Sequence, residues 1–520
     1  MKLFTRFLFR IPLMLLAGIA LAGCEKQLET VPQQSIDAET ALTSREAIEA
    51  SITASYGRLK SARLYGRDLI THPEALADNG YATNKSGRLV PEANNTAGAA
   101  NHFTGNVWIN SYAAINQINL TLEAIPGIAG ATAAEKARWE GQLYFLRGLF
   151  YFDLIRVYAY IPGAVVDAQN RGGVPLTLRG FSTVDSALAF KPARAPIDDV
   201  YTQIVSDLQQ ANNLLTFPGL GINLANKAAA QLLLARVNLY RKNFTDAKRW
   251  SDSVINIAGS RLTNTTNHVA NWRTENHNET LFQVRFATNA ENIGVNESLQ
   301  TSFTTLGTVG NPAVTVGFGD LVPTLGLLNE LGITLVGGNN FTNYTGANAA
   351  IADRSPDVRN LLYEPGTTGR GKSYIETTKY MGKNGFPNLD NVPVLRIAEA
   401  YLIRAEAQAT EGSAVFDEAA ARADLKMLKS NRYTGYAGSA IEIADDALAG
   451  TELLEEILRQ RRIEFAFEGH RFFDLKRLGR DILKSLPTGA IVQFTDIRIL
   501  PAIPQVEIDA NPNLKQNPGY

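Results

Sequence analysis

Residues that could build a disulfide framework or a metal centre are scarce in this sequence. The 520 residues include one cysteine, which excludes an intramolecular disulfide and a cysteine metal cluster. The five histidines, at positions 72, 102, 268, 277 and 470, include no His-x-x-x-His pair, so no zinc site is expected. We therefore expect neither a metal nor a cofactor.

The chain also lacks an excess of charge and the common hydrolase signatures. Lys and Arg number 50 against 51 for Asp and Glu, a formal net charge of −1, which gives no electrostatic reason to expect nucleic acid or an acidic partner. Neither G-x-S-x-G nor H-E-x-x-H occurs, so two common signatures of nucleophilic and zinc-dependent hydrolases are missing. We expect no catalytic residues.

The N-terminus contains only a short hydrophobic run. Lys2, Arg6 and Arg10 precede the apolar stretch 11–22, which is too short for a comfortable membrane span and is typical of a secretory signal. The run ends in LAGC at 21–24, which resembles the lipobox of bacterial lipoproteins.

This N-terminal pattern predicts how the chain is processed. Residues 1–23 are predicted to be a signal peptide, cleaved before Cys24, whose sulfur would carry a lipid such as palmitate. The polar stretch 24–43 has no sustained apolar period and is predicted to be a lipidated tether. A membrane-tethered protein outside the cytoplasm is expected, where almost no ATP is present.

Most of the mature chain has the apolar spacing of helices. Apolar stripes predict helices within 44–60, 107–125, 131–161 and 195–215. Two further segments, 226–257 and 394–432, each contain two helical patterns separated by a short break. Small residues within such pairs are typical of tetratricopeptide-like hairpins. The sequence predicts a mainly α fold with about four of these hairpins.

A long loop-rich insertion interrupts the helical pattern. The stretch 258–392 is rich in Gly, Asn and Thr and has short β-like runs such as TLFQVRFA, and the stretch 78–106 has the same character. We predict a single domain over 44–520, made of a helical scaffold (44–257 and 393–480), the insertion 258–392 and an extended C-terminal tail (481–520). Loops on a rigid frame commonly carry binding residues.

One loop matches a nucleotide-binding pattern letter by letter. GTTGRGKS at 366–373 fits G-x-x-x-x-G-K-[ST]. A phosphate loop needs a buried strand before it and a helix that begins at its Lys-Ser. Here SPDVRNLLYEP precedes the motif, and SYIETTKYM, which alternates like a strand, follows. We predict a glycine-rich turn and no bound nucleotide.

The most tempting catalytic pair is Glu464 and Glu468, four residues apart in RRIEFAFEGHRFFDLKR. A glycosidase needs one carboxyl group with a raised pKa, whereas basic neighbours such as Arg461 and Arg462 keep carboxylates ionised. We interpret the pair as part of a charge network that pins the end of the last helix, which Gly469 would break.

Aromatic residues are better candidates for ligand contact. Flat rings flanked by Asn, Asp and Arg suit a sugar, whose C–H face stacks on the ring while its hydroxyls form hydrogen bonds. Trp108, Trp139 and Trp250 lie in helical patterns and are predicted to pack in the core. The candidate ligand residues lie in loop-rich stretches and are Asp78, Asn79, Tyr81, Asn101, His102, Phe103, Trp272 and Tyr344. The alternative is that these rings cap the core.

Several longer motifs resemble one family. RQRRIEFAFEGHRFFDLKRLG (459–479) and LPAIPQVEIDANPNLKQNPGY (500–520) are similar to the ending of the SusD/RagB family, outer-membrane lipoproteins of Bacteroidetes-type bacteria. Further similar stretches are WINSYAAINQIN (108–119), YFLRGLFYFDLIRVYAYIPG (144–163), GGVPL (172–176), LRIAEAYLIRAEA (395–407) and Asp357-Val-Arg359 ahead of Lys379-Tyr380. Gly141 and Gly148 depart from the family's alanine-rich pattern and are expected to alter local helix packing but not the fold.

The resemblance implies a cell-surface protein of the outer membrane that captures a glycan without catalysis. It also implies a TonB-dependent, SusC-like transporter as the partner that receives the oligosaccharide. The ligand residues vary within the family, so the resemblance indicates regions, 72–106 and 258–392, rather than particular side chains. A receptor for peptides and a helical-repeat scaffold without a small ligand remain as alternatives, and a surface hydrolase is disfavoured.

Overall fold

The computed structural model describes residues 41–96, 98, 103, 106–484 and 489–520. The predicted signal peptide, Cys24 and nearly all of the predicted tether therefore lie outside the described residues, as do Asn101 and His102. Residues Ser44–Tyr520 form one compact unit, and the following description concerns this unit.

The helices and strands alternate in an uneven order along this unit. The helices are α2 (Arg45–Leu59), α3 (Asp68–Leu76), α4 (Val90–Ala93), α5 (Asn106–Ala124), α6 (Ala133–Tyr158), α7 (Val184–Ala189), α8 (Ile197–Leu214), α9 (Lys227–Tyr240), α10 (Phe244–Ala258), α11 (His268–Asn271), α12 (Leu299–Phe303), α13 (Leu325–Glu330), α14 (Phe341–Gly346), α15 (Ile397–Ala409), α16 (Glu418–Ser430), α17 (Ala440–Ala447), α18 (Gly450–Glu464), α19 (Arg471–Leu478) and α20 (Gln505–Ala510). The strands are β1 (Gly80–Ala82), β2 (Thr280–Val284), β3 (Leu306–Thr308), β4 (Asn311–Thr315), β5 (Leu321–Pro323), β6 (Ile333–Leu335), β7 (Ile351–Arg354), β8 (Tyr363–Pro365), β9 (Ile375–Thr377), β10 (Val392–Arg396), β11 (Ile482–Leu483) and β12 (Ile491–Val492). Short 3₁₀ turns connect several of them, such as Ile125–Gly127 and Val358–Leu362.

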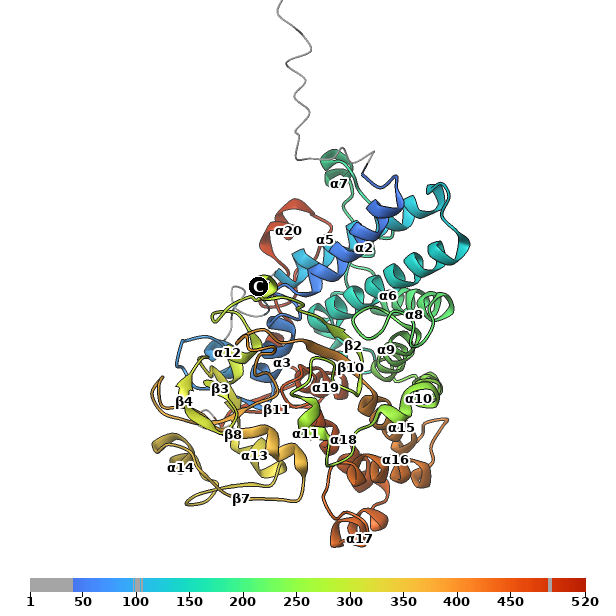
Figure 1. The fold of residues 1–520 in the computed structure, drawn as a ribbon. Helices are drawn as coiled ribbons and strands as arrows, with labels where there is room; N and C mark the ends of the chain where they lie inside the picture. The colour runs from blue at the N-terminus through green and yellow to red at the C-terminus, as the bar shows by residue number, and fades with distance from the viewer. Residues whose placement is uncertain (1–40, 97, 99–102, 104–105, 485–488) are drawn as a thin grey trace, which may run out of the picture. The chain divides into compact units, whose positions relative to one another are not determined.

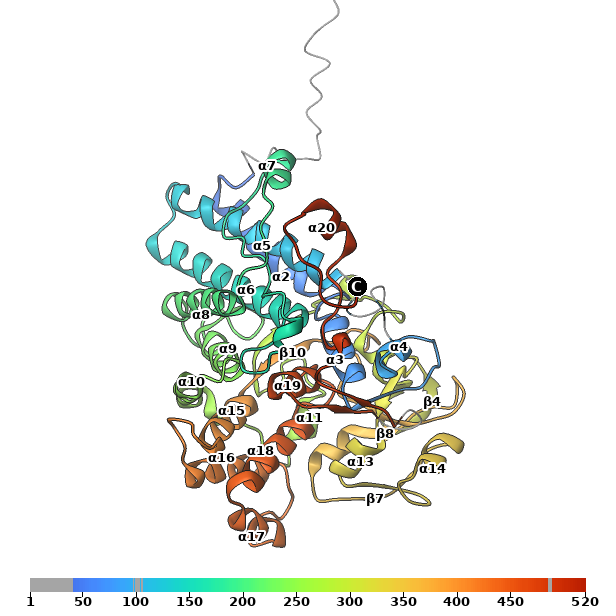
Figure 2. The same cartoon turned by 180° about the vertical axis from the view of Figure 1, so that it is seen from behind.

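The long helices pack against one another in a continuous series. The successive contacts are α2 with α5, α5 with α6, α6 with α8, α8 with α9, α9 with α10, α10 with α15, and α15 with α16. Both ribbon views show this series along one side of the unit, with the short helices and strands of the insertion on the other side (Figures 1 and 2). The prediction of a mainly α fold with tetratricopeptide-like helix pairs is confirmed.

The helix α6 is buried along its C-terminal half, as its apolar sequence predicts. It begins with a capping box, in which Thr132 and Glu135 each bond the other's backbone N–H, and such a box satisfies two otherwise unpaired donors. Gly141 and Gly148 face α8, where an added Cβ would lie 2.9 Å from Leu215 and 3.0 Å from Leu208, respectively. These two glycines allow α6 and α8 to approach closely.

Six two-stranded antiparallel sheets occur among the described residues, and two of them join segments that are distant in the sequence. In the first such pair, β2 with β10, Val392 lies opposite Val284, so the two ends of the insertion meet at the helical scaffold. In a second pair, β1 with β5, Gly80 lies opposite Pro323. The loop-rich stretch 78–106 is thus fastened to the insertion by a shared sheet.

A buried ion-pair network surrounds the C-terminal end of α18. Glu464 accepts bonds from Arg396 at 3.0 Å and from Arg432 at 2.9 Å, and Glu468 contacts Arg396 at 2.8 Å and Lys379 at 2.6 Å. Burial alone would raise the pKa of Glu464, but Arg432 and Arg396 hold it well below its usual range. The interpretation of the two carboxylates as structural is confirmed.

The partners in this network differ from those expected from sequence neighbours. Arg461 pairs with Glu399 at 3.0 Å and with Asp474 at 2.9 Å, while Arg462 pairs with Asp78. The cations at the two glutamates come instead from distant segments. The helix also ends at Glu464 and not at Gly469, and a further helix follows that glycine.

The C-terminal tail is less extended than predicted, because it contains the β11–β12 pair and α20. Its last residues are tied to the helical scaffold. The Asn517 side chain donates to the backbone oxygens of Tyr158 and Pro501, at 2.9 and 2.8 Å. The motif at 500–520 therefore serves to fix the tail.

Candidate functional site

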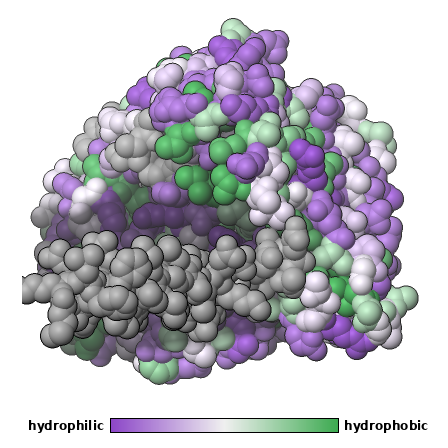
Figure 3. Space-filling view, turned by 90° about the horizontal axis from the view of Figure 1, so that it is seen from above, coloured by the Kyte–Doolittle hydropathy of each residue, from purple (hydrophilic) through white to green (hydrophobic). Residues whose placement is uncertain are grey.

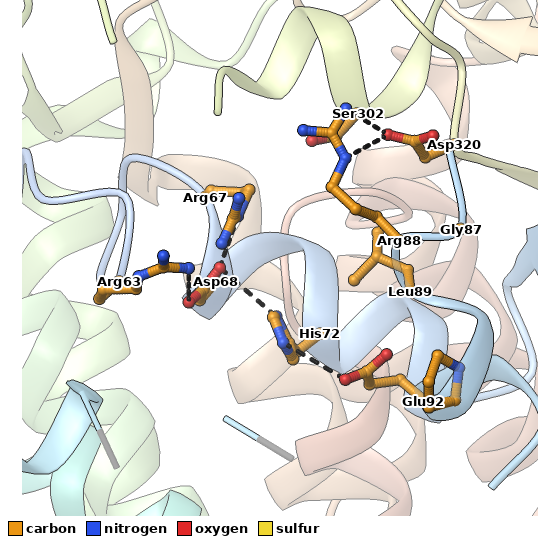
Figure 4. Close-up of a pocket in the computed structure, with 11 residues that line it drawn as sticks. Arg63, Arg67, Asp68, His72, Gly87, Arg88, Leu89, Glu92, Ser302 and Asp320 are labelled. Atoms are coloured by element: carbon orange, nitrogen blue, oxygen red, sulfur yellow. Dashed lines mark hydrogen bonds and ion pairs between the residues drawn. The ribbon is translucent and has the colours of Figure 1, made fainter. Parts of the chain in front are cut away.

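A polar cavity of about 280 Å³ lies where the two loop-rich stretches meet. Its lining consists of Arg63, Arg67, Asp68, His72, Gly87, Arg88, Leu89, Pro91, Glu92, Ser302 and Asp320. Figure 4 shows that α3, the loop after β1 and the insertion all contribute side chains. Six of these eleven residues are Arg, Asp or Glu, so the cavity can offer directional hydrogen bonds to a polar ligand.

The loop between β1 and α4 is held in an unusual backbone conformation. Asn84 and Leu89 have φ angles of 60° and 62°, a region that side chains other than glycine rarely adopt. Leu89 is also the residue before Val90, where α4 begins. Backbone strain of this kind persists where surrounding contacts enforce it and is common at binding sites.

Arg88 supplies those contacts to the loop. Its Nε donates to the Asp320 carboxylate at 3.0 Å, and a second guanidinium nitrogen lies 2.9 Å from the same oxygen. Another nitrogen donates to the backbone oxygen of Asn296. Ser86 donates to the other Asp320 oxygen at 2.6 Å. Asp320 is 1% exposed, and burial raises its pKa even though Ser86 and Arg88 act in the opposite direction.

His72 occupies the floor of the cavity between two carboxylates. Its ring nitrogens lie 3.7 Å from Asp68 and 3.7 Å from Glu92 (Figure 4). The ring also stacks on Phe103, with centroids 5.3 Å apart. Arg67 completes this wall by donating to Asp68 at 2.6 Å. These contacts hold the polar groups of α3 and α4 in fixed directions.

A group of aromatic rings is built on the same β1–β5 sheet. Tyr81 lies within 6.2 Å of the ring centres of Phe341 and Tyr344 and 5.9 Å from that of Tyr374. Tyr81 and Phe341 are half-buried, whereas Tyr344 is buried and donates its hydroxyl to the Pro323 backbone oxygen at 2.7 Å. The group therefore offers ring surface to solvent through Tyr81 and Phe341.

Three of the predicted ligand rings are buried in the structure. Phe103, Trp272 and Tyr344 are 0%, 8% and 1% exposed, which fits the alternative that these rings cap the core. Trp272 contacts His277 and Tyr380 edge to face, with centroids 4.8 and 6.1 Å away. Loop sequence alone does not show that these loops fold back and bury their own aromatics.

The predicted polar candidates also have internal partners. Asp78 accepts from Arg471 at 2.7 Å, and Asn79 donates to Glu74 at 3.1 Å and accepts from Arg462 at 2.8 Å. These bonds join the start of β1 to α18 and α19. Asp78 and Asn79 thus position the strand that carries Tyr81, and Tyr81 alone among the described candidates combines ring surface with partial exposure.

Arg88 and Asp320 are central to the site but were not among the residues predicted from the sequence. Arg88 and Asp320 are 232 residues apart in the sequence, so no local pattern connects them. A partial signal exists for His72, because Asp68 precedes it by one helical turn and a carboxylate there can face the ring.

The phosphate-loop motif forms the connection of a hairpin. Pro365 in β8 lies opposite Ile375 in β9, in antiparallel register. The Gly366 N–H donates to the Tyr374 backbone oxygen at 2.8 Å. A strand rather than a helix follows the motif, which is the glycine-rich turn that the sequence predicts.

A second cavity, of about 350 Å³, lies between α5, α7 and α20 and is lined mainly by apolar side chains such as Trp108, Ile115 and Phe190. Seen from above, hydrophobic residues gather near the middle of this face beside a hollow with hydrophilic walls (Figure 3). On α7, Val184 and Leu188 are strongly exposed, at 72% and 62%. In the described part of the chain, no helix combines the length and apolar composition that a membrane crossing requires.

The fold and the site together define a helical-repeat protein with a loop-built cavity that is rich in charged residues. Two sequence models match the chain: the SusD family over residues 342–520, and the family described as starch-binding associating with outer membrane over residues 27–239. The chain belongs to the SusD/RagB family.

Individual relatives agree over nearly the whole length. SusD-like protein P2 of Formosa agariphila is 26% identical over 526 residues, covering 96% of this chain and 98% of the relative. A SusD superfamily structure from Bacteroides thetaiotaomicron superposes with a TM-score of 0.74 at 24% identity, covering 91% of this chain and 99% of that one. A laminarin-binding SusD-like protein superposes with a TM-score of 0.66 at 21% identity, covering 92% and 100%.

Proposed function

We propose that this protein is a non-catalytic receptor that binds an oligosaccharide at the polar cavity and the neighbouring Tyr81 ring. The observation that carries the proposal is the junction itself: β1–β5 and the Arg88–Asp320 bond bring both loop-rich stretches together beside a partly exposed aromatic group. Stacking surface next to fixed hydrogen-bonding groups is the combination that sugars require. The laminarin-binding relative adds support from a protein of the same fold.

Binding rather than turnover is supported by the state of the carboxylates. Glu464 and Glu468, the pair with glycosidase-like spacing, are 2% and 5% exposed and are saturated by cations. Asp68 and Asp320 in the cavity are likewise engaged by Arg67 and Arg88. These bonds fix the carboxylates as positioning groups for a receptor.

Calorimetry against a panel of oligosaccharides, with the full chain in detergent, tests the proposal. The variant Tyr81→Ala should weaken binding by about tenfold, because it removes the stacking surface and its buried area. Phe416→Ala is the matched control, since Phe416 is an aromatic residue that is 46% exposed between α15 and α16 on the helical scaffold. Absence of binding to every glycan, or equal effects of both variants, would reject the proposal.

We further propose that the protein is anchored through Cys24 in the outer membrane, faces the cell exterior and delivers its ligand to a TonB-dependent, SusC-like transporter. The lipobox at 21–24 and the family model's description support this placement. The chain should label with radioactive palmitate, and Cys24→Ala should abolish both labelling and membrane retention. A transporter should co-purify with the full chain from mild-detergent extracts, and its repeated absence would contradict the delivery step.

A further inference from the structure

The loop between β8 and β9, whose motif does not fit a nucleotide, carries two cations without an acidic partner. Arg370 is exposed and donates from Nε to the Gly317 backbone oxygen at 2.9 Å. Lys372 is half-buried and donates from Nζ to the Tyr344 backbone oxygen. Among the described residues, neither side chain forms an ion pair. Their positive charges are therefore uncompensated.

Two aromatic rings hold these cations beside two others from the loop after β1. The guanidinium carbons of Arg370 and Arg88 lie 3.8 and 4.9 Å from the centre of the Phe318 ring. The Lys372 and Lys85 ammonium groups lie 4.3 and 5.5 Å from the centre of the Tyr374 ring. We call Lys85, Arg88, Arg370 and Lys372 the cation cluster.

Two carboxylates neutralise only half of the cation cluster. Asp320 is bonded by Arg88, and Glu376 lies 3.6 Å from the Lys85 ammonium nitrogen. Glu376 is itself held by the backbone N–H of Thr305 at 2.7 Å. These pairings leave a local excess of two positive charges on the β8–β9 loop, at Arg370 and Lys372, although the whole chain is close to neutral.

The excess charge has a physical cost that a bound anion would relieve. Burial, together with repulsion from Lys85, lowers the pKa of Lys372 to about 8. Like charges held close together disfavour the charged form, and an anion between them restores it. Guanidinium groups bind planar oxyanions through paired bonds, and an ammonium group adds a point charge.

We propose that the cation cluster binds the carboxylate or sulfate group of an acidic glycan while the sugar ring stacks on the half-buried Tyr81. This inference rests on the proposed glycan-binding function and names the ligand class for the same site. The net charge of the chain gives no reason to expect an acidic partner, whereas the local excess of positive charge on this face does. The oxyanion would sit on the β8–β9 loop, and the rest of the chain would extend toward the cavity.

Paired ligands that differ only in charge provide the test. Their binding to the full chain in detergent is again measured by calorimetry. Polygalacturonate oligomers are compared with their methyl esters, and dextran sulfate is compared with dextran. The protein should bind at least one acidic form at least about tenfold more tightly than its neutral counterpart. A rise in salt from about 0.05 to about 0.5 M shortens the Debye length from roughly 14 to roughly 4 Å and should therefore weaken that binding. The first pair reports on carboxylates and the second on sulfates.

Variants assign the charge effect to the cluster. Arg370→Gln with Lys372→Met should remove most of the preference for the acidic form and leave binding of the neutral form unchanged. Lys515→Met, at an exposed lysine in the C-terminal tail, should have no effect. A purely structural role of Arg370 and Lys372 would instead lower the affinity for both forms equally.

The outcomes separate the two proposals. Equal affinity for the charged and neutral members of both pairs, or no binding to either acidic polymer, overturns the acidic-glycan inference even if neutral glycans in the wider panel bind. Absence of binding to every glycan overturns the proposed function as well. The comparison of paired ligands uses the unmodified protein, so it remains decisive if the double variant does not fold.

Discussion

Glu74, near the end of α3, is a carboxyl group whose environment changes its chemistry. It is fully buried and accepts bonds from the Asn79 side chain at 3.1 Å and from the Gly469 N–H at 3.0 Å. Burial raises the pKa of Glu74 to about 7 despite these bonds. The residue thus links the sheet that carries Tyr81 to the turn between α18 and α19.

The raised pKa of Glu74 makes folding stability depend on pH. The unfolded carboxyl group ionises near pH 4.5, while the folded one keeps its proton up to about pH 7. The contribution of Glu74 to the free energy of unfolding is therefore fully present below pH 4.5 and declines as the pH rises to about 7. Comparison with Glu74→Gln by urea unfolding at several pH values should show the wild type losing about 3 kcal/mol more than the variant over this range. Parallel pH profiles of the two proteins would contradict this account.

Among the elements, α6 and α8 show how glycine sets the distance between packed helices. Gly141 lies in a buried part of α6 against Leu214 and Leu215. Gly57 in α2 is a useful comparison, because an added Cβ there would meet nothing within 4 Å.

We expect substitution by alanine to change the stability of the protein in opposite directions at the two glycines. Gly141→Ala should destabilise the protein by about 1–3 kcal/mol, because the methyl group would lie 2.9 Å from Leu215 and force the helices apart. Gly57→Ala should stabilise it by about 0.5–1 kcal/mol through the better helix propensity of alanine. Chemical denaturation of both variants checks the pair, and equal shifts of the same sign would show that α6–α8 spacing is not the cause.

These elements also show what could be read from the sequence. The helices at 44–60, 107–125 and 131–161 could be predicted because their apolar residues repeat with the helical period, which is a local property. The site could not be predicted in this way, because Arg88 contacts Asp320, and Lys85 contacts Glu376, only after the insertion folds back. The burial of Trp272 and Phe103 has the same cause, since loop composition does not reveal which rings a later segment covers.

At the scale of the whole molecule, buried ion pairs tie the helical scaffold to the insertion. Arg359 and Lys379 come from the insertion and contact Glu464 and Glu468 at the end of α18, at 3.4 and 2.6 Å. Arg396, at the end of β10, contacts both glutamates. The motif 459–479 therefore supplies Glu464 and Glu468 to a network that joins the scaffold to the insertion.

Breaking the network at its centre should therefore destabilise the entire unit. Glu464→Gln is expected to cost about 3–5 kcal/mol, because it leaves Arg396 and Arg432 buried with insufficient negative charge. Glu411→Gln, at an exposed position in the turn after α15, should stay within about 0.5 kcal/mol of the wild type. Denaturant unfolding of the two variants would reject this role for Glu464 if their stabilities were the same.

The central claim, that the junction of the two loop-rich stretches is a glycan-binding site, is tested most directly by a crystal structure of the protein with an oligosaccharide that it binds. We predict that the sugar contacts Tyr81 and the Arg88 loop and reaches toward Lys372. A sugar seated instead in the apolar cavity between α5, α7 and α20, or on the helical face, would contradict the account.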